Sequence, residues 1–207
     1  IQMIDTQTGW VLTNNNGNLL KTTNGGLNWN LQQVNSTDSG FDVHFSDSQY
    51  GWITGRDGAV YRSEDGGNSW LKLSTGTTKY LYAVHFINNL VGWIAGEDGT
   101  LLYTTDGGGS WDVQSLNFAG DLRSIYFPDM QFGAITGAGG GIVKTSNGGT
   151  NWVLNFAATQ DLKAVFFIDS QNGWAVGDKG TIIHTSNGGA TWTAQSSGTS
   201  YPLYDIF

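Results

Sequence analysis

Short apolar runs alternate with polar, glycine-rich segments along the whole chain, and one unit shows this pattern clearly. Four of its runs are rich in β-branched and aromatic residues, which predicts four β-strands: "LYAVHF" (81–86), "GWIAG" (92–96), "TLLYT" (100–104) and "WDVQSL" (111–116). The segments "EDG" and "TDGGGS" separate the last three runs, and Asp and Gly accept the backbone angles of tight turns. The unit is therefore expected to be a four-stranded antiparallel meander.

The same unit occurs five times at a near-constant period. Each copy carries the pattern S/T-x-D/N-x-G-x-x-W, and its tryptophans stand at positions 29, 70, 111, 152 and 192. A second landmark, Gly-Trp, opens the second strand at 9–10, 51–52, 92–93 and 173–174, and becomes Gly133–Ala134 in the fourth copy. Because repeated four-stranded meanders must stack on their neighbours, we predict an all-β fold, a five-bladed β-propeller of four-stranded antiparallel blades that fills residues 1–207 as a single domain.

The two chain ends resemble the two halves of one first strand. "LYDIF" (203–207) matches the start of that strand, as in "LKAVF" (162–166), and "IQMIDTQTGW" (1–10) matches its continuation, as in "VFFIDSQNGW" (165–174). We therefore expect the N- and C-terminal segments to share one strand and to close the ring. A run of five repeats cut in phase from a longer array is the alternative.

The glycine-rich turn before each repeat tryptophan has a structural interpretation. Asp106, or the asparagine at 24, 147 or 187, is expected to accept hydrogen bonds from nearby backbone N–H groups and so to hold the turn. A Ca²⁺ loop needs several charged oxygen ligands, and three of the five copies have the neutral Asn. We therefore predict no metal site, and we expect all nine tryptophans to pack between sheets because each falls on a repeat position.

The composition excludes several functions. The net charge is −8 with only nine Lys and Arg, and there is no basic run, so we expect no nucleic-acid partner. No apolar run is long enough to span a bilayer, so we expect no direct membrane insertion. Cysteine is absent, and Asn, Gly, Ser and Thr outweigh Lys and Glu, which suits a secreted or periplasmic protein. We expect no cofactor.

The pattern S/T-x-D/N-x-G-x-x-W, met by all five copies, resembles the Asp-box of bacterial neuraminidase repeat (BNR) propellers. The longer segment "GWIAGEDGTLLYTTDGGGSW" (92–111) is similar to the photosystem II stability/assembly factor-like branch of that family. The resemblance implies a β-propeller and a range of roles that includes sialidases, other glycoside hydrolases, sorting receptors and assembly chaperones. The photosystem branch implies seven blades and an Arg-rich docking face, whereas this chain has five repeats and three arginines.

A catalytic site finds little support in the residues. Resemblance to sialidases implies an arginine cluster, a Tyr–Glu pair and an Asp acid, but the arginines fall at three different repeat positions: Arg56, Arg62 and Arg123. Glu64 and Glu97 lie in different turns. Asp121 and Asp161 occupy equivalent loop ends of neighbouring repeats, so they are a conceivable carboxylate pair, although many surface acids would produce such a pair by chance. We therefore predict no catalytic residues, and we interpret His44 and His85, which share a repeat position with aromatic residues, as packing between blades.

Variable residues within the constant frame mark a candidate binding site. The second residue of each first strand is expected at the channel mouth, and these residues are Asp42, Tyr82, Arg123, Lys163 and Tyr204. The preceding loops and one hairpin turn add further candidates: Tyr80, Phe118, Phe156, Tyr201 and Arg56. Aromatic and charged groups converging on a concavity are typical of ligand sites. The alternative is a solvated rim without a ligand.

These residues favour a non-enzymatic binding or scaffolding propeller whose loop-rich face engages a protein or peptide partner. The loops between repeats differ in every copy, as "STGTTKY" (74–80), "LNFAGD" (116–121) and "FAATQD" (156–161) show, which favours one asymmetric site. A lectin that binds glycans and a sialidase-like glycoside hydrolase are the alternatives.

Overall fold

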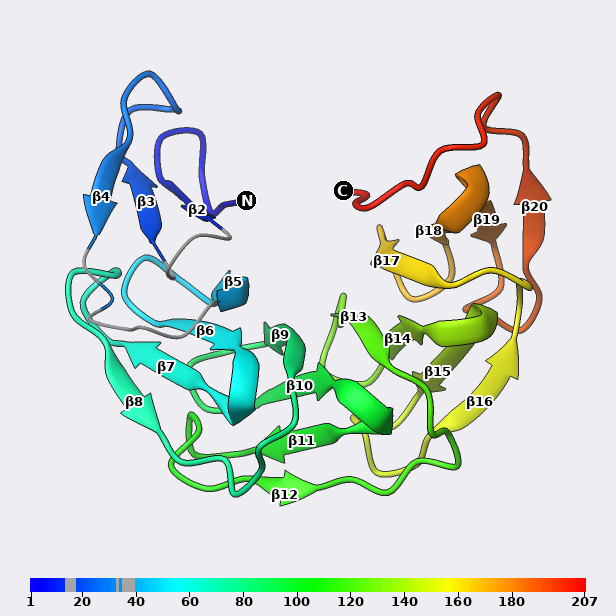
Figure 1. The fold of residues 1–207 in the computed structure, drawn as a ribbon, viewed down its shortest axis with the longest axis horizontal. Coiled ribbons are helices and arrows are strands. Elements are labelled where there is room, and N and C mark those ends of the chain that lie inside the picture. The colour runs from blue at the N-terminus through cyan, green and yellow to red at the C-terminus, as the bar shows by residue number, and fades with distance from the viewer. Residues whose placement is uncertain (14–17, 33, 35–39) are drawn as a thin grey trace. The chain divides into compact units, whose positions relative to one another are not determined.

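The computed structural model describes residues 1–13, 18–32, 34 and 40–207, and it folds them into five four-stranded antiparallel sheets (Figure 1). Within every sheet the strands pair in the order in which they follow one another along the chain. Each sheet is therefore a meander, which confirms the prediction of four strands for each repeat.

The strands are short and follow the apolar runs of each repeat closely. The first sheet contains β1 (Gln2–Met3), β2 (Gly9–Leu12), β3 (Leu19–Thr22) and β4 (Asn30–Gln32). The second contains β5 (Gly40–Phe45), β6 (Gly51–Gly55), β7 (Val60–Ser63) and β8 (Leu71–Leu73), and the third contains β9 (Leu81–Phe86), β10 (Gly92–Gly96), β11 (Leu101–Thr104) and β12 (Asp112–Val113). The fourth contains β13 (Leu122–Tyr126), β14 (Gly133–Gly137), β15 (Gly141–Thr145) and β16 (Val153–Phe156). The fifth contains β17 (Leu162–Phe167), β18 (Gly173–Gly177), β19 (Ile182–Thr185) and β20 (Thr193–Gln195).

Single 3₁₀ turns join the second strand to the third in four of the sheets. They are η1 (Arg56–Gly58), η2 (Glu97–Gly99), η3 (Ala138–Gly140) and η4 (Asp178–Gly180). In the "EDG" segment Asp98 has φ 53° and Gly99 has φ 71°, which confirms the tight turn that these residue types predict. Within the described part of the chain, no helix is both long and apolar enough to cross a membrane.

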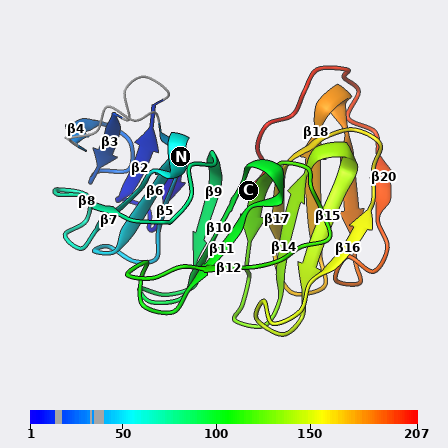
Figure 2. The same cartoon turned by 60° about the horizontal axis from the view of Figure 1, so that its bottom comes forward.

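The contacts divide the chain into two compact units. The first comprises Ile1–Ile94 and Leu102–Gln114, and the second comprises Ala95–Leu101 and Ser115–Phe207. Within the first unit β5 lies beside β9, and within the second unit β13 lies beside β17 (Figures 1 and 2). Consecutive sheets thus pack through their first strands inside each unit, as stacked propeller blades do.

The predicted sharing of a strand by the two chain ends stays a prediction. Residues 1–10 contribute β1, which pairs with β2 through Gln2 and Met3. Residues 203–207 form no strand, and the Leu203 N–H donates to the Gly177 carbonyl 3.0 Å away. The prediction of a single domain over residues 1–207 also stays a prediction.

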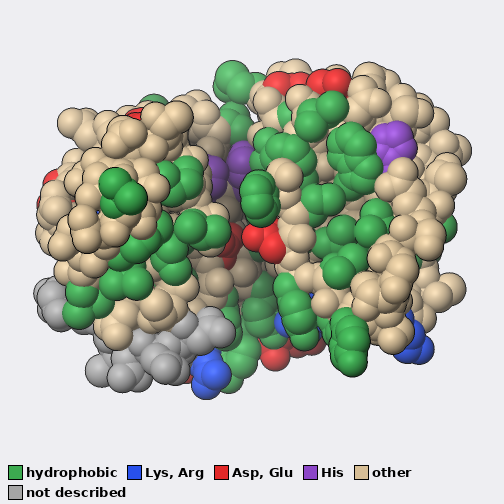
Figure 3. Space-filling view, turned by 90° about the horizontal axis from the view of Figure 1, so that it is seen from above, with side chains coloured by type: hydrophobic (Ala, Val, Ile, Leu, Met, Phe, Trp, Pro, Cys, Tyr) green, Lys and Arg blue, Asp and Glu red, His purple; other side chains and the backbone are tan. Residues whose placement is uncertain are grey.

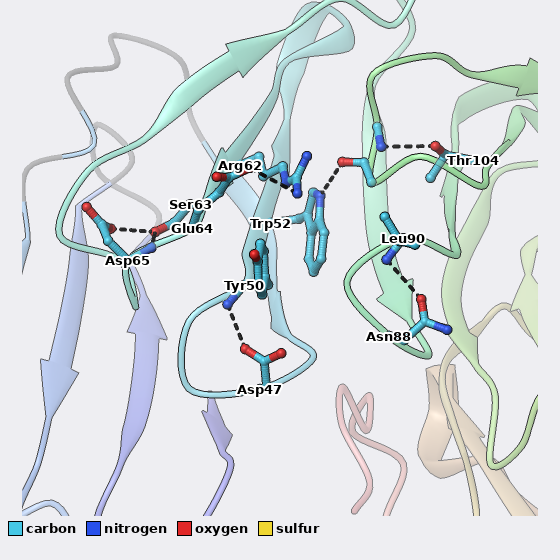
Figure 4. Close-up of polar contacts among 12 residues, drawn as sticks. Asp47, Tyr50, Trp52, Arg62, Ser63, Glu64, Asp65, Asn88, Leu90 and Thr104 are labelled. Carbon is cyan, nitrogen blue, oxygen red and sulfur yellow. Dashed lines mark hydrogen bonds and ion pairs between the residues drawn. The ribbon is translucent and has the colours of Figure 1, made fainter.

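A phenylalanine at the end of the first strand joins neighbouring sheets. The Phe86 ring stacks on the Trp52 ring of the preceding sheet, with centroids 3.5 Å apart and planes 4° from parallel. The Trp111 ring meets the same phenylalanine edge-on, at 6.2 Å and 84°. Trp52 and Phe86 are buried. Trp52 Nε1 donates to the carbonyl of Gly107, in the glycine-rich turn of the third sheet, at 3.1 Å (Figure 4). The same arrangement links Trp10 to Phe45.

In four of the five sheets, the glycine that opens the second strand makes room for that phenylalanine. A Cβ added to Gly92 would collide with the Phe86 ring of the same sheet. The same collision would occur in three other sheets, between the pairs Gly51 and Phe45, Gly133 and Phe127, and Gly173 and Phe167. Phe45 and Phe86 therefore lie between a tryptophan of the preceding sheet and a bare glycine backbone of their own sheet, which is a reason for the Gly-Trp pair that the sequence pattern did not reveal.

The glycine-rich turn is held as the sequence predicts. The Thr104 hydroxyl donates to Asp106 Oδ1 at 2.8 Å and accepts the Gly108 N–H at 2.9 Å. Asp106 accepts the hydroxyl of Ser110 at 2.7 Å and its N–H at 2.9 Å, and these bonds hold the Asp106 pKa well below its usual range. Asn187 accepts the Thr191 N–H at the same 2.9 Å, so the neutral residue supports the turn equally well. Among the described residues no group of three His, Cys, Asp or Glu gathers to hold a metal ion.

The tryptophans differ in burial according to their repeat position. Those of the Gly-Trp pairs are buried at positions 10, 52 and 93, whereas Trp174 is half-buried. All five tryptophans that follow the glycine-rich turns are half-buried. The structure thus confirms packing between sheets most strongly for Trp10 and Trp52, whose stacking partners belong to the next sheet.

The substitution Gly92→Ala should lower the free energy of unfolding by about 1–3 kcal/mol, because the added methyl overpacks a ring that Trp52 holds in place. The matched control is Gly109→Ala, at a position that is Ala190 in the fifth repeat and where φ is not positive. That control should be neutral or stabilise by about 0.4–1 kcal/mol. Chemical denaturation measures both variants, and equal losses of stability would refute the proposed role of the glycine.

Candidate functional site

The first strand of the second sheet has a different register from the one that we expected. β5 and β17 begin alike, with Gly40 opposite Gly55 and Leu162 opposite Gly177, and a bulge follows in both. Phe41 is therefore the equivalent of Lys163, and the expectation that placed Asp42 at this position is corrected. The signal was in the sequence, since "GFDVHF" aligned with "LYAVHF" places Phe41 against Tyr82.

Asp42 serves the packing of neighbouring sheets. Its Oδ2 accepts the Val84 N–H of β9 at 3.0 Å, and its Oδ1 accepts the Val43 N–H at 2.8 Å. Ser124 stands at the equivalent position in the fourth sheet, and its Oγ accepts the Val165 N–H of β17 at 3.3 Å. Both side chains connect first strands of neighbouring sheets, so this position belongs to the structural frame.

Three of the predicted residues come together in the first unit with one that the sequence reasoning missed. The rings of Phe41 and Tyr82 are 5.4 Å apart, those of Phe41 and Tyr80 are 5.9 Å apart, and those of Tyr80 and Tyr82 are 6.4 Å apart. The Arg56 guanidinium lies over Phe41 at 6.0 Å and over Tyr80 at 5.9 Å. We call these four residues the arginine–aromatic cluster.

The backbone brings the cluster together from two sheets. Arg56 begins η1 of the second sheet, and the Gly58 N–H at the end of η1 donates to the Lys79 carbonyl at 2.9 Å. This bond places η1 against the segment that leads into β9, where Tyr80 and Tyr82 stand. Arg56 is exposed and the three rings are half-buried, so the cluster offers both ring surface and guanidinium donors to solvent.

The two predicted cations of the second unit, Arg123 and Lys163, form ion pairs. Arg123 Nη2 lies 2.7 Å from Asp121 Oδ2, and Lys163 Nζ lies 3.1 Å from Asp178 Oδ2 and 3.7 Å from Asp161 Oδ2. The same acids hold hairpin turns, because Asp121 Oδ1 accepts the Asp98 N–H at 3.2 Å and Asp161 Oδ1 accepts the Gly139 N–H at 2.8 Å. Asp121 and Asp161, the conceivable catalytic pair, are thus committed to ion pairs and turn contacts.

The remaining predicted residues also lie in the second unit. The rings of Phe118 and Phe156 are 6.2 Å apart, and Phe156 is 66% exposed. Tyr201 and Tyr204 follow β20 and are 78% and 72% exposed. Lys and Arg side chains are sparse on the face in Figure 3, in keeping with nine in the whole chain. The convergence of the other nine predicted residues on one channel mouth stays a prediction.

The other arginine supports the frame. Arg62 Nη2 pairs with Glu64 Oε1 at 3.0 Å, and its guanidinium lies over Tyr50 at 5.5 Å and over Trp52 at 5.9 Å (Figure 4).

A general acid in glycoside hydrolysis needs a raised carboxyl pKa. Four carboxyl groups instead have pKa values held below the usual range, and these are Asp5, Asp65, Asp106 and Asp169.

His44 packs between first strands, as we expected. Its Nε2 lies 2.9 Å from the Phe86 carbonyl, and its ring centroid lies 4.6 Å from that of His85. Removal from water lowers the His44 pKa to about 4, so the ring is neutral at pH 7 and its Nε2 must carry the proton that the carbonyl accepts. Gln2 makes the corresponding contact in the first sheet, where its Nε2 donates to the Phe45 carbonyl at 2.9 Å.

The sequence matches a family model described as photosynthesis system II assembly factor YCF48, over residues 1–73 and 27–161. The chain belongs to this family. No curated protein matches the sequence significantly. The match agrees with the resemblance to photosystem II assembly factor-like BNR repeats that the sequence carries.

Solved structures show the fold. YCF48 bound to D1 peptide is 18% identical, with a TM-score of 0.55 over 93% of this chain and 78% of that chain. YCF48 from Cyanidioschyzon merolae is 17% identical, with a TM-score of 0.54 over 96% of this chain and 85% of that chain. An ancestral GH74 enzyme is 18% identical with a TM-score of 0.74, and the match covers 93% of this chain but 30% of the enzyme. Together with the five sheets, these likenesses confirm an all-β propeller fold of four-stranded antiparallel blades.

The substitution His44→Gln should flatten the dependence of stability on pH between about pH 6.5 and 4. The unfolded chain binds a proton on His44 below its ordinary pKa of 6.5, whereas the folded chain resists protonation down to a pKa of about 4. The wild type therefore loses stability as the pH falls through this interval, and glutamine keeps a donor without titrating. Denaturation series over this range test the prediction, and an unchanged slope in the variant would count against it.

Proposed function

We propose that the chain is a non-enzymatic binding or scaffolding propeller that engages a protein or peptide through the arginine–aromatic cluster. The observation that carries the proposal is the convergence of Phe41, Tyr80 and Tyr82 around the Arg56 guanidinium. Arg56 is exposed, whereas the predicted cations of the second unit, Arg123 and Lys163, form ion pairs with the turn-binding Asp121 and Asp161.

The chemistry of the cluster suits a peptide. Tyrosine and arginine are enriched among the residues that contribute most to protein–protein binding, because each combines a large contact area with hydrogen-bonding groups. Half-buried rings lose little side-chain freedom on binding, and an exposed guanidinium can meet backbone carbonyls or a carboxylate. The structural likeness to YCF48 bound to D1 peptide supports a peptide as the class of partner for this chain as well.

The likeness to GH74 enzymes makes a glycoside hydrolase the second candidate. One of them, the xyloglucanase from Xanthomonas campestris, is 16% identical with a TM-score of 0.68, and this chain spans 34% of it. Hydrolysis needs two suitably placed carboxyl groups, and the pair Asp121 and Asp161 is engaged by Arg123 and Lys163. We therefore expect no product from xyloglucan or from aryl glycosides, including a sialoside, and release of sugar would favour the hydrolase.

We also propose that the protein acts outside the cytoplasm. A chain of 207 residues without cysteine, rich in Asn, Gly, Ser and Thr, carries no thiol that an oxidising compartment would modify. Fractionation of the native source with antibody detection tests this, and recovery in the cytoplasmic fraction would oppose it.

The double substitution Arg56→Ala with Tyr82→Ala should weaken peptide binding by about tenfold or more while the melting temperature changes little. Two anchors of this kind each contribute on the order of 1–2 kcal/mol to an interface. The probes are peptides selected from a random displayed library on the wild-type protein, together with a D1 peptide. Their dissociation constants are measured by calorimetry against both proteins.

The matched control is Lys72→Ala, which removes another cation that lies over a ring. Lys72 lies on β8 of the second sheet, and its Nζ is 5.6 Å from the centre of the Tyr61 ring. Peptide binding should be unchanged in this control. Selection of no peptide, or equal binding by the wild type and the double variant, would show that the cluster is not a peptide site.

A further inference from the structure

The fourth sheet departs from the repeat at the second strand, where Ala134 stands in place of the tryptophan. Phe132, two residues earlier, takes over the contact with the next sheet and meets the Phe167 ring at 4.8 Å and 62°. Phe132 is 8% exposed and Ala134 is 1% exposed, so both are buried. The contact between these sheets is therefore kept by a smaller ring that reaches it from a different backbone position.

A cleft of about 430 Å³ lies beside Phe132, on the side of the glycine-rich turns. Polar side chains from both the fourth and the fifth sheet line it, and six of them are Gln131, Lys144, Ser146, Asn151, Gln171 and Asn187. Val153 adds an apolar surface that is 55% exposed. The volume of the cleft is at the lower end of the range for small-molecule sites, which begins at about 300 Å³.

The corresponding hollow of the second sheet is built differently. It measures about 350 Å³, and the described residues that line it all belong to that sheet, among them the ion-paired Arg62 and Glu64. The fourth sheet has Lys144 and Ser146 at these two repeat positions. Lys144 Nζ donates to the Gly188 carbonyl of the fifth sheet at 2.8 Å, and the short Ser146 side chain leaves open the space that a glutamate would enter.

The lining has the hydrogen-bonding character of a site for a neutral ligand. Amide side chains donate and accept at once, as sugar hydroxyls do, and three of them in the lining are Gln131, Asn151 and Gln171. Asn147 and Asn187 also line the cleft, but each holds its glycine-rich turn by accepting a backbone N–H at 2.9 Å. The carboxylate in the lining, Asp129, already accepts the N–H groups of Gln131 and Phe132 through Oδ1, at 2.7 Å each. The cation, Lys144, is bound to a backbone carbonyl.

We propose that the cleft beside Phe132 binds a neutral mono- or oligosaccharide. The amides pair with hydroxyls, and Val153 packs against the C–H face of the sugar ring. A charged ligand fits less well, because the lining holds one cation and one carboxylate that both have protein partners. None of the lining residues belongs to the arginine–aromatic cluster of the first unit, so this site is independent of the proposed peptide site and each can fail alone.

The test uses the full chain and a glycan array of neutral oligosaccharides of glucose, galactose, mannose, xylose and N-acetylglucosamine, with acidic and sulfated glycans beside them. Binding of any neutral glycan is then quantified by calorimetry for the wild type and two variants. Ser146→Glu introduces the residue that the second repeat carries as Glu64, next to Lys144, and should weaken binding about tenfold or more by obstructing the cleft. Gln131→Ala removes one amide without adding bulk and should also weaken binding.

The matched control is Ser186→Glu, the same change at the equivalent position of the fifth repeat, which does not line the cleft. Its affinity should stay within about twofold of the wild type, because the cleft is untouched. The proposal is overturned if no neutral glycan binds, if acidic glycans bind in preference, or if Ser186→Glu weakens binding as much as Ser146→Glu. If Ser146→Glu lowers the melting temperature strongly, its loss of binding reports on folding, and the Gln131→Ala variant is used instead. Unchanged glycan binding by Gln131→Ala then overturns the proposal.

Discussion

Within each compact unit, a phenylalanine ring at the end of a first strand connects one sheet to the preceding one, as Phe45, Phe86 and Phe167 show. Phe86 lies between the Trp52 ring of the preceding sheet and the bare backbone of Gly92 in its own sheet, with the edge of Trp111 beside it. This arrangement explains why Gly and Trp occur together, and why a second tryptophan follows the glycine-rich turn. Because a four-stranded sheet this small cannot bury its faces alone, the contact between sheets is the part of the core that makes the repeats cooperative.

The architecture was predictable because its signals repeat. The 41-residue spacing, the turns with Asp106 or Asn187, and the strands around Gly-Trp all appear as the sequence indicates. The candidate site was predicted only in part. Asp42 was placed one residue out of register, because the register of β5 against β6 puts Phe41 at the position of Lys163. Phe41 was missed although the alignment of "GFDVHF" with "LYAVHF" places it against Tyr82. Phe132 was missed because its role depends on a contact between sheets, which no single repeat shows.

The two proposed sites follow from departures from a constant frame. Positions that hold the frame are occupied alike in every sheet, such as the turn residue equivalent to Thr104 and the glycine equivalent to Gly92. The arginine–aromatic cluster uses positions that vary between repeats, and the cleft beside Phe132 exists where Ala134 replaces a tryptophan. Membership of the YCF48 family is consistent with a frame that keeps its fold while its variable positions take on binding roles.

A double-mutant cycle between Trp52 and Phe86 tests the central claim most directly. Each residue is changed to leucine, singly and together, and the free energy of unfolding is measured by chemical denaturation. Because the stacked rings are buried and in direct contact, we predict a coupling energy of about 1 kcal/mol, with the double variant losing less than the sum of the single losses. Losses that add to within about 0.3 kcal/mol would show that the ring contact does not join the sheets.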